Sequence, residues 1–500
     1  NVTGNDNTAV GASALELNTA TGNTAVGYLA LCCNTSGTAN VAIGGSTLMR
    51  NATTTRNVAV GASALSCNVG SCNTGLGHSA LTANSSGDFN VAVGACALDA
   101  NTTADSNTAV GTLSLSTNTT GANNTAVGKD ALLANTTGGQ NAAVGYCALK
   151  ENTTASNNSA FGNQAMQNNT TGASNVALGY ESLKANTTAA HNTAVGKGSM
   201  EANTTGHSNT AVGSCASKAN TTAAGNTAVG FQSLLVATTG GDNTAVGELA
   251  LGSLTDAVEN VAVGRCALRL NTTADGNTAV GTKAMAANTT GEGNVGVGSY
   301  SLDANTTAAN NTAVGTSAAG AVTTGAANTF IGNRAGCTTT TGNNNITLGY
   351  LAKTAAVNTN DEIVISTNAV GKGATTAFIN PYGGAVYAGN NNANFSTTSD
   401  RRIKKNIVDN NTGLEKINQI RIRNFEYRTE DEITEVPSHA AILNKGIQLG
   451  VIAQEIEPIL PDVVRVESTG VKTVDPGNLT FYMINAIKEL TKRIEELEKK

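Results

Sequence analysis

The sequence predicts a mainly β protein: an elongated parallel β-solenoid, or β-roll, of 17-residue coils, followed by a small α+β domain that ends in a coiled-coil helix. Three observations predict this. A short motif recurs through residues 1–349. Large side chains are scarce, with no tryptophan and 3% aromatic residues, so the repeats can fill only a narrow core. Charge gathers in the last hundred residues, which hold 16 of the 29 basic and 16 of the 35 acidic side chains.

The repeated unit is Asn-Thr-Ala-Val-Gly or a close variant, which first occurs at Asn7 and last, as the 21st copy, at Asn345. Successive copies are 17 residues apart, except for two intervals of 16 near the start. This period is too short for a helix-turn-helix repeat or a four-stranded blade, and it fits one coil of a solenoid. With roughly 4.8 Å per stacked coil, the array would form a rod on the order of 100 Å long.

Particular positions of the unit have expected roles. Gly11 and its equivalents would supply backbone freedom where the chain must bend. Asparagines recur at the start of the unit and eleven positions later, as at Asn7 and Asn18. Asparagine tolerates left-handed backbone geometry, and stacked copies could form amide ladders between coils. We expect these two columns to organise the turns.

Apolar residues occur side by side in the unit, as in Ala9-Val10 and Ala14-Leu15. Because a strand points neighbouring side chains to opposite faces, both faces would need to be buried. One face can line the interior of the coil, and the other needs another chain. We therefore expect the rod to be a homotrimer.

Many units contain Asn-Thr-Thr, a sequon for N-glycosylation, as at Asn101, Asn118 and Asn135. We interpret these residues as requirements of the solenoid rather than as glycan acceptors. The cysteines are interpreted in the same way, as small side chains in repeat positions, because none has zinc-ligand spacing with histidine and their number is odd. They are Cys32, Cys33, Cys67, Cys72, Cys96, Cys147, Cys215, Cys266 and Cys337.

The bulk properties exclude several classes of function. A net charge of −6 gives no basic surface for nucleic acid, and no apolar run of 18 residues predicts membrane insertion. The chain begins with Asn1 and shows no signal segment, so we expect a fragment or a processed form, with an anchoring region before it. The variable positions of the repeats, such as Tyr146, Arg265 and Tyr300, show no cluster along the sequence.

After the repeats, residues 350–398 predict a β-rich neck, with short strands expected near residues 361–366 and 383–389 between Gly/Asn turns. The last helix is expected to form a coiled coil over residues 479–500. Its apolar residues have alternating spacings of four and three, which is typical of a coiled-coil seam. They are Met483, Ile487, Leu490, Ile494 and Leu497.

The C-terminal part, residues 399–500, contains motifs in a specific order. These are SDRRIKKNI at 399–407, GVIAQEI at 450–456 with LPDVV at 460–464, and the helix from Tyr482 onwards. The combination resembles the peptidase S74 family, the intramolecular chaperone at the C-terminus of phage tail fibres and tailspikes. The resemblance implies that this domain trimerises, guides the folding of the fibre that precedes it, and then cuts itself off.

Carried over to this sequence, the resemblance implies that Ser399 is the nucleophile, Lys404 its base and Ser399–Asp400 the cleaved bond. A serine hydroxyl needs a base, and lysine serves as one only if burial or a nearby cation lowers its pKa. Some members also use a histidine near the second motif. Here Gln448 stands two residues before Gly450, and the nearest histidine is His439. No metal and no cofactor are implied.

The repeats also resemble the head repeats of trimeric autotransporter adhesins, which build a parallel β-roll, although those repeats are usually shorter. The resemblance to the peptidase S74 family implies a virion fibre that is assembled in the host cytoplasm. Its expected partners are two further copies, a host cell-surface receptor such as a glycan, and other virion components bound through the missing N-terminal region. The alternatives are a trimeric bacterial surface adhesin, a fibre that retains an uncleaved assembly domain, and a processing enzyme with external substrates.

Overall fold

The computed structural model describes residues 4–380, 386–388, 401–435, 446–466 and 470–499. The chain forms two compact units, Asn1–Thr398 and Ser399–Lys500, which are treated separately below. Within the described residues, no helix has the length and apolar character needed to cross a bilayer.

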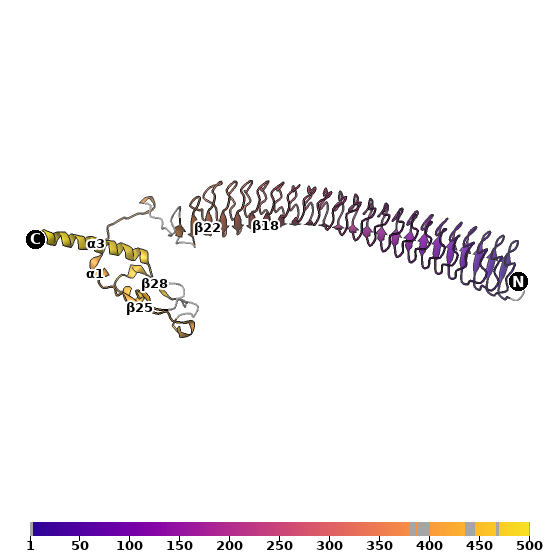
Figure 1. Ribbon diagram of the computed structural model, residues 1–500, viewed down its shortest axis with the longest axis horizontal. Coiled ribbons are helices and arrows are strands. Elements are labelled where there is room, and N and C mark those ends of the chain that lie inside the picture. Colours follow the sequence, from indigo (N-terminus) through magenta and orange to yellow (C-terminus); the bar gives the residue numbers. More distant parts are fainter. Residues whose placement is uncertain (1–3, 381–385, 389–400, 436–445, 467–469, 500) are drawn as a thin grey trace. The chain divides into compact units, whose positions relative to one another are not determined.

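The first unit is a parallel β-solenoid, as the repeat predicts (Figure 1). Each coil contributes one three-residue strand, and each strand pairs in parallel with the equivalent residues of the next coil, for example Ala194 with Ala211. The coils with a 16-residue interval keep this register, because Val58 pairs with Thr74. The strands are β1 Thr8–Val10, β2 Thr24–Val26, β3 Val41–Ile43, β4 Val58–Val60, β5 Thr74–Leu76, β6 Val91–Val93, β7 Thr108–Val110, β8 Thr125–Val127, β9 Ala142–Val144, β10 Ser159–Phe161, β11 Val176–Leu178, β12 Thr193–Val195, β13 Thr210–Val212, β14 Thr227–Val229, β15 Thr244–Val246, β16 Val261–Val263, β17 Thr278–Val280, β18 Val295–Val297, β19 Thr312–Val314, β20 Thr329–Ile331 and β21 Ile346–Leu348.

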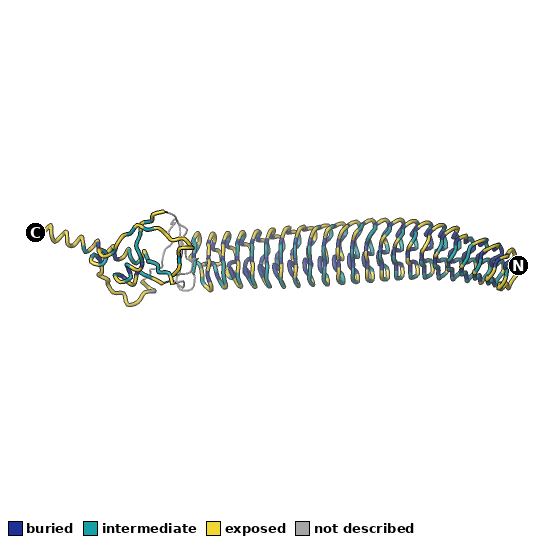
Figure 2. The backbone as a smooth tube through the Cα atoms, turned by 90° about the horizontal axis from the view of Figure 1, so that it is seen from below, coloured by how far each residue is buried: buried dark blue, intermediate teal, exposed yellow. Residues whose placement is uncertain are grey.

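The core of the solenoid is a narrow column of small and medium side chains. Figure 2 shows that buried residues recur from coil to coil along this unit. The middle residue of each strand points inward, so that Ala109 and its equivalents are buried. A leucine or methionine eight positions after the first asparagine, such as Leu115, fills the rest of the column. The first and third residues of each strand point outward. The core is therefore closed within a single chain, and the outer face of the sheet is not part of it.

The pair Ala14-Leu15 behaves differently from the expectation. It is not part of a strand, because Ser13 and Leu15 both have left-handed backbones, with φ of 54° and 53°. The chain turns twice around the pair, and the equivalents of both residues, such as Ala97 and Leu98, face the core. The prediction that both apolar pairs demand burial on two faces was wrong here; only the Ala9-Val10 pair alternates.

The sequence suggested that the ladder asparagines adopt the left-handed backbone conformation, but other positions of the repeat adopt it. They lie six and eight positions after the first asparagine and directly before it. A left-handed backbone costs a non-glycine residue about 1–2 kcal/mol. Inter-coil hydrogen bonds offset this cost. The N–H of Leu113 donates to Ala95 in the preceding coil and that of Leu115 to Ala131 in the following coil, at 3.1 and 3.0 Å.

Glycine is required four positions after the first asparagine, as predicted. Gly111 has a φ of 135°, and a Cβ there would lie 2.6 Å from the carbonyl group of Gly128 in the next coil. The close approach of successive backbones therefore adds to the need for a positive φ.

The asparagines at the start of each unit form the first amide ladder, as predicted. The Oδ1 of Asn192 accepts from the backbone N–H of Asn209 at 2.9 Å, and its Nδ2 donates to the carbonyl of Gly206 at 2.9 Å. Equivalent bonds join the coils from Asn7 to Asn345. The first amide ladder thus satisfies backbone groups that are buried between coils.

The asparagines eleven positions later form the second amide ladder, in which Asn101 donates to Oδ1 of Asn84 at 2.9 Å. Here the amides bond mainly to each other and to the carbonyl three residues on. Where the column has Ala237, Leu254 or Val322 instead, the apolar side chain joins the core. The sequon residues Asn101, Asn118 and Asn135 belong to this ladder and are fully buried, which fits a structural role.

The C-terminal end of the solenoid is closed by Glu362, which takes the place of the next ladder asparagine. Its carboxylate is fully buried and accepts from the N–H groups of Ala355 and Gly373, at 2.8 and 2.7 Å. Two further parallel strands, β22 (Ile363–Ser366) and β23 (Ala377–Asn380), continue the sheet, and β24 (Val386–Ala388) pairs antiparallel with β23. A few apolar side chains, Ala352, Val364 and Phe378, form a separate terminal core.

One coil conserves core volume by exchanging two side chains. Phe330 replaces the usual strand alanine, and Gly336 replaces the usual leucine. A Cβ at Gly336 would collide with the Phe330 ring. We expect Gly336→Leu to destabilise the solenoid by about 1–3 kcal/mol through overpacking. The double variant Phe330→Ala/Gly336→Leu should recover most of that loss in thermal unfolding followed by circular dichroism. If the double variant lost as much stability as Phe330→Ala and Gly336→Leu lose in sum, the two side chains would not compensate for each other in volume.

The second unit is small and has both helices and strands. Its elements are η1 (Arg401–Ile403), α1 (Leu414–Ile417), β25 (Arg423–Phe425), η2 (Glu430–Glu432), β26 (Gln448–Gly450), α2 (Ala453–Ile456), η4 (Pro461–Val463), β27 (Val464–Val466), β28 (Lys472–Val474) and α3 (Pro476–Glu498). The antiparallel pairs are β25–β26 and β27–β28. Its core is formed by Ile456, Leu460, Val463 and Tyr482, with partly buried neighbours.

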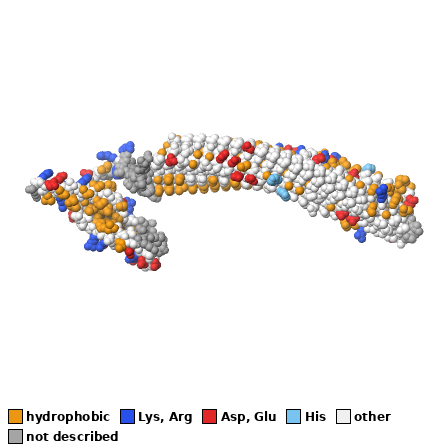
Figure 3. All heavy atoms as spheres, in the orientation of Figure 1, with side chains coloured by type: hydrophobic (Ala, Val, Ile, Leu, Met, Phe, Trp, Pro, Cys, Tyr) orange, Lys and Arg blue, Asp and Glu red, His pale blue; other side chains and the backbone are white. Residues whose placement is uncertain are grey.

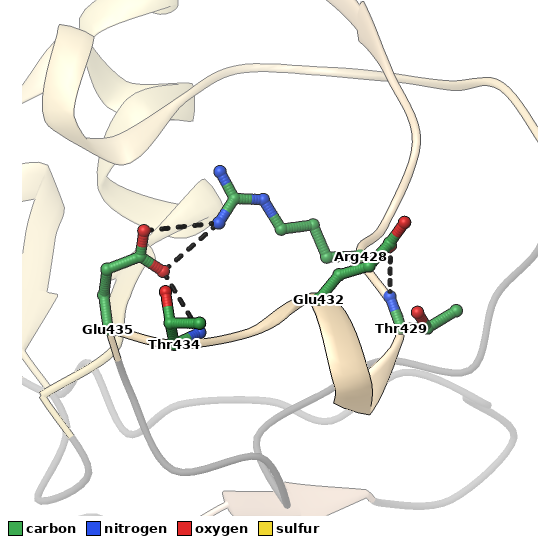
Figure 4. Close-up of polar contacts among 5 residues, drawn as sticks. All are labelled: Arg428, Thr429, Glu432, Thr434 and Glu435. Carbon is green, nitrogen blue, oxygen red and sulfur yellow. Dashed lines mark hydrogen bonds and ion pairs between the residues drawn. The ribbon is translucent and has the colours of Figure 1, made fainter.

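Polar contacts fix the ends of two elements in this unit. Helix α3 begins at Pro476, where the Asp475 side chain caps it by accepting from the N–H groups of Gly477 and Asn478. The segment from Arg428 to Glu435 is held by its own contacts (Figure 4). Arg428 pairs with Glu435 at 3.2 Å, and Glu432 accepts from the N–H of Thr429 at 2.9 Å.

Candidate cleavage site and assembly surfaces

The predicted cleavage site is described in part. Ser399 and Asp400 lie outside the described residues, so the distance between Ser399 and Lys404 is not defined. Lys404 directly follows η1, and its backbone N–H donates to the carbonyl of Arg401 at 3.2 Å. In the single chain the Lys404 side chain is exposed.

The second motif, residues 450–456, connects β26 to α2. Gly450 ends β26, and a Cβ at this position would lie 3.0 Å from the ring of Phe425 in the paired strand. Glu455 on α2 forms a two-point ion pair with Arg423 on β25, at 2.7 and 3.1 Å. The Arg423 guanidinium lowers the pKa of the Glu455 carboxyl. The motif therefore ties α2 to the small sheet.

Gln448, which stands where some members of the family have a histidine, lies in β26 and donates from Nε2 to the carbonyl of Gly446 at 3.1 Å. His439 lies outside the described residues. The described part of this motif thus contributes no imidazole.

The LPDVV segment holds the last helix. Val463 is buried in the core, and Asp462 accepts a 2.6 Å hydrogen bond from the hydroxyl of Tyr482 on α3. This bond and partial burial raise the pKa of the Tyr482 hydroxyl. On the α1 side, the backbone N–H of Leu414 donates to Glu489 of α3 at 3.1 Å. The motifs therefore build a support that presents α3.

Helix α3 carries an exposed apolar seam. The residues with alternating four- and three-residue spacing all lie at its surface in the single chain: Met483, Ile487, Leu490, Ile494 and Leu497. Ile487 is 64% exposed and Leu497 69% exposed. No described residue of the chain covers this seam, which is the pattern of a helix that packs against other helices.

The solenoid has a second exposed apolar surface, which we call the outer apolar column. It consists of the third residue of each strand, repeated at every coil on the outer face of the sheet. Hydrophobic side chains form a row along this unit (Figure 3). The members are Val10, Val26, Ile43, Val60, Leu76, Val93, Val110, Val127, Val144, Phe161, Leu178, Val195, Val212, Val229, Val246, Val263, Val280, Val297, Val314, Ile331, Leu348 and Ile365. Such a long apolar surface indicates a protein interface.

The variable residues of the repeats share one edge of the solenoid, which the linear sequence did not indicate, although Tyr146 lies seven coils from Arg265. Tyr146, Arg265 and Tyr300 lie five or six positions after the first asparagine of their coils, on one edge of the solenoid. Lys129 lies over the Tyr146 ring at 5.5 Å, and Lys283 over the Tyr300 ring at 5.5 Å. The position of these residues within the repeat is the sequence signal that would have indicated their common edge.

Comparison with known proteins places the C-terminal unit. Residues 399–465 match the Peptidase_S74 family model, described as the chaperone of endosialidase. The chain is 32% identical over 111 residues to a probable tail fiber protein of Escherichia phage Phieco32, a match that covers 21% of this chain and 14% of that protein. It is 33% identical over 120 residues to the long tail fiber protein Gp37 of Salmonella phage S16, which covers 23% and 15%. The matches thus span about one seventh of these relatives.

Proposed function

We propose, from a C-terminal unit that carries a chaperone-of-endosialidase domain, that this chain is a homotrimeric virion fibre of the tail, which acts in host attachment. In this proposal the C-terminal unit assembles three chains, the solenoids fold against one another, and the unit is then released at the Ser399–Asp400 bond. The match at residues 399–465 carries the proposal.

Two exposed apolar surfaces support the trimer. The outer apolar column places a valine, isoleucine, leucine or phenylalanine at every coil that is exposed or only half-buried in the single chain. The seam of α3 adds a second surface in the C-terminal unit. Burial of apolar surface contributes about 25 cal/mol per Å², so a contact repeated at each coil adds up along the rod.

The repeats also explain why such a fibre needs a chaperone. Because most coils present the same residues, a shift of one chain by a single coil changes few contacts. A C-terminal clamp brings three chain ends together before the coils stack, which sets the starting alignment. After cleavage the fibre no longer carries the domain that assembled it. It then persists because its unfolding is slow.

The cleavage chemistry follows from the two proposed residues. Lys404 takes the hydroxyl proton of Ser399, and Oγ attacks the carbonyl carbon of the Ser399–Asp400 bond. The nitrogen of Asp400 leaves as an amine after receiving that proton from Lys404, and water hydrolyses the four-membered lactone that joins Oγ of Ser399 to its own carbonyl carbon. Because Lys404 is exposed in the single chain, a site that is completed only by the neighbouring chains would couple cleavage to assembly.

Intact mass and N-terminal sequencing test this proposal on the wild type, Ser399→Ala, Lys404→Ala and, as a matched control, Lys405→Ala. The wild type and Lys405→Ala should yield a fragment that begins at Asp400, whereas the Ser399 and Lys404 variants should form trimers that stay full length. If every protein stays full length while forming trimers, the unit is a retained assembly domain and the proposed cleavage is wrong.

A further inference from the structure

The two edges of the solenoid sheet carry different charges. The post-strand edge comprises the residues five to ten positions after the first asparagine of each coil. The pre-strand edge comprises the four residues before that asparagine. They flank opposite ends of each strand, so they lie on opposite sides of the outer apolar column. In a three-fold assembly around that column, the post-strand edge of one copy faces the pre-strand edge of the next.

In the middle of the solenoid, between Asn124 and Asn226, this facing pair is nearly neutral, with Lys197 as its one cation outside the ion pairs given below. The pre-strand edge has no Asp, Glu, Lys or Arg in these coils. On the post-strand edge every carboxylate is paired with a lysine of its own chain. The pairs are Lys129–Asp130, Lys150–Glu151, Lys184–Glu181 and Lys218–Glu201.

Beyond this region both edges change together. The pre-strand edge acquires five exposed carboxylates and no cation, namely Asp242, Asp256, Glu259, Asp275 and Glu292. In the same coils the post-strand edge has three cations and two carboxylates. Arg265 is paired with Glu248 at 3.1 Å, whereas Arg269 and Lys283 form no ion pair with the described residues.

The cationic edge is also hollowed. A groove of about 490 Å³ is lined by Arg265, Arg269, Lys283, Tyr300 and Asp303, among others. Lys283 lies over the Tyr300 ring at 5.5 Å, and Asp303 is the single carboxylate against three cations in the lining of the groove. The groove can therefore receive carboxylate side chains from outside the chain.

We propose that the pre-strand edge at residues 242–292 of one copy docks against the post-strand edge at residues 265–303 of the next copy, and that this charged contact aligns the chains along the rod. The inference rests on the proposed trimer. A slip of several coils would move the five carboxylates away from Arg269 and Lys283 and place them against the self-paired region. Complementary charge thereby distinguishes coils that are otherwise alike.

Carbodiimide cross-linking of the full-length protein tests the contact, with two differently tagged copies expressed together so that links between chains can be recognised. We expect an amide between Lys283 of one copy and Asp275 or Glu292 of another. The yield of this link should fall several-fold at about 1 M salt, where the screening length shrinks to about 3 Å. Links from Lys283 to Asp242 alone, or no link between chains of a trimer, would overturn the inference.

Charge reversal gives an independent measurement. Arg269→Glu/Lys283→Glu and Glu259→Lys/Glu292→Lys should each lower the melting temperature of the trimer by several degrees, and the chain that carries all four changes should recover most of the loss. Lys197→Glu, on the post-strand edge of a neutral coil, is the control and should change little. Failure of the four-fold variant to recover would overturn the inference. A wild type that sediments as a monomer would instead overturn the proposed trimer, and this contact with it.

Discussion

Asn192→Ala is expected to destabilise the solenoid by about 1–3 kcal/mol, because it leaves the buried backbone N–H of Asn209 without a partner. The Asn192 amide accepts from this N–H and donates to the carbonyl of Gly206, at 2.9 Å each, and that carbonyl keeps a second hydrogen bond from Asn203. Each unsatisfied buried group costs about 1–3 kcal/mol. The measurement is thermal or denaturant unfolding of the full chain, followed by circular dichroism.

Two matched variants isolate the role of the first amide ladder. Thr205→Ala changes an exposed side chain of the same region and should have almost no effect. Asn203→Leu removes an amide of the second ladder, where other coils already carry an apolar residue such as Leu254. It should cost less than Asn192→Ala, since no backbone N–H donates to Asn203. Equal losses for all three variants would contradict the distinction between the ladders.

The second large effect is expected in α3. Ile487→Glu combined with Leu490→Glu should abolish trimer formation, because three copies would place six carboxylates in the seam that the proposal buries. Burial of an unpaired charge is far more costly than burial of a neutral polar group. The expected result is a chain that sediments as a monomer or aggregates, and that is not cut after Ser399.

Lys492→Ala is the control for this prediction, because Lys492 is exposed on α3 and lies outside the seam. It should assemble as the wild type does. A trimer of normal yield from Ile487→Glu/Leu490→Glu would show that the seam is not an assembly surface, and cleavage of that variant would separate cutting from assembly.

The repeat predicted much of the solenoid, because its period and its invariant positions report local needs directly. Gly111 is glycine for both its φ and its close approach to the next coil, and Asn192 is asparagine because two backbone groups bond to its amide. The turn at Ser13 and Leu15 could not be predicted. Neither residue type favours a left-handed backbone, and the inter-coil hydrogen bonds that offset its cost exist only in the stack.

The candidate sites were predictable to different degrees. The motifs at 399–407 and 450–464 indicated the family, since their order is specific, but the geometry of Ser399 lies outside the described residues. The sequence did not indicate what the second motif does locally; Glu455 pairs with Arg423, and Asp462 holds Tyr482. The charged edges were missed because residues such as Glu259 and Arg269 are scattered along the sequence. Only their positions within the coil assign them to the pre-strand and post-strand edges.

The most direct test of the account is the sedimentation of residues 1–398 made with and without the C-terminal unit. The account predicts that the full chain yields a rod with the mass of three solenoids, and that the chain lacking residues 399–500 yields monomers or aggregates. An equal yield of trimeric rods from both chains would contradict the claim that the C-terminal unit directs assembly.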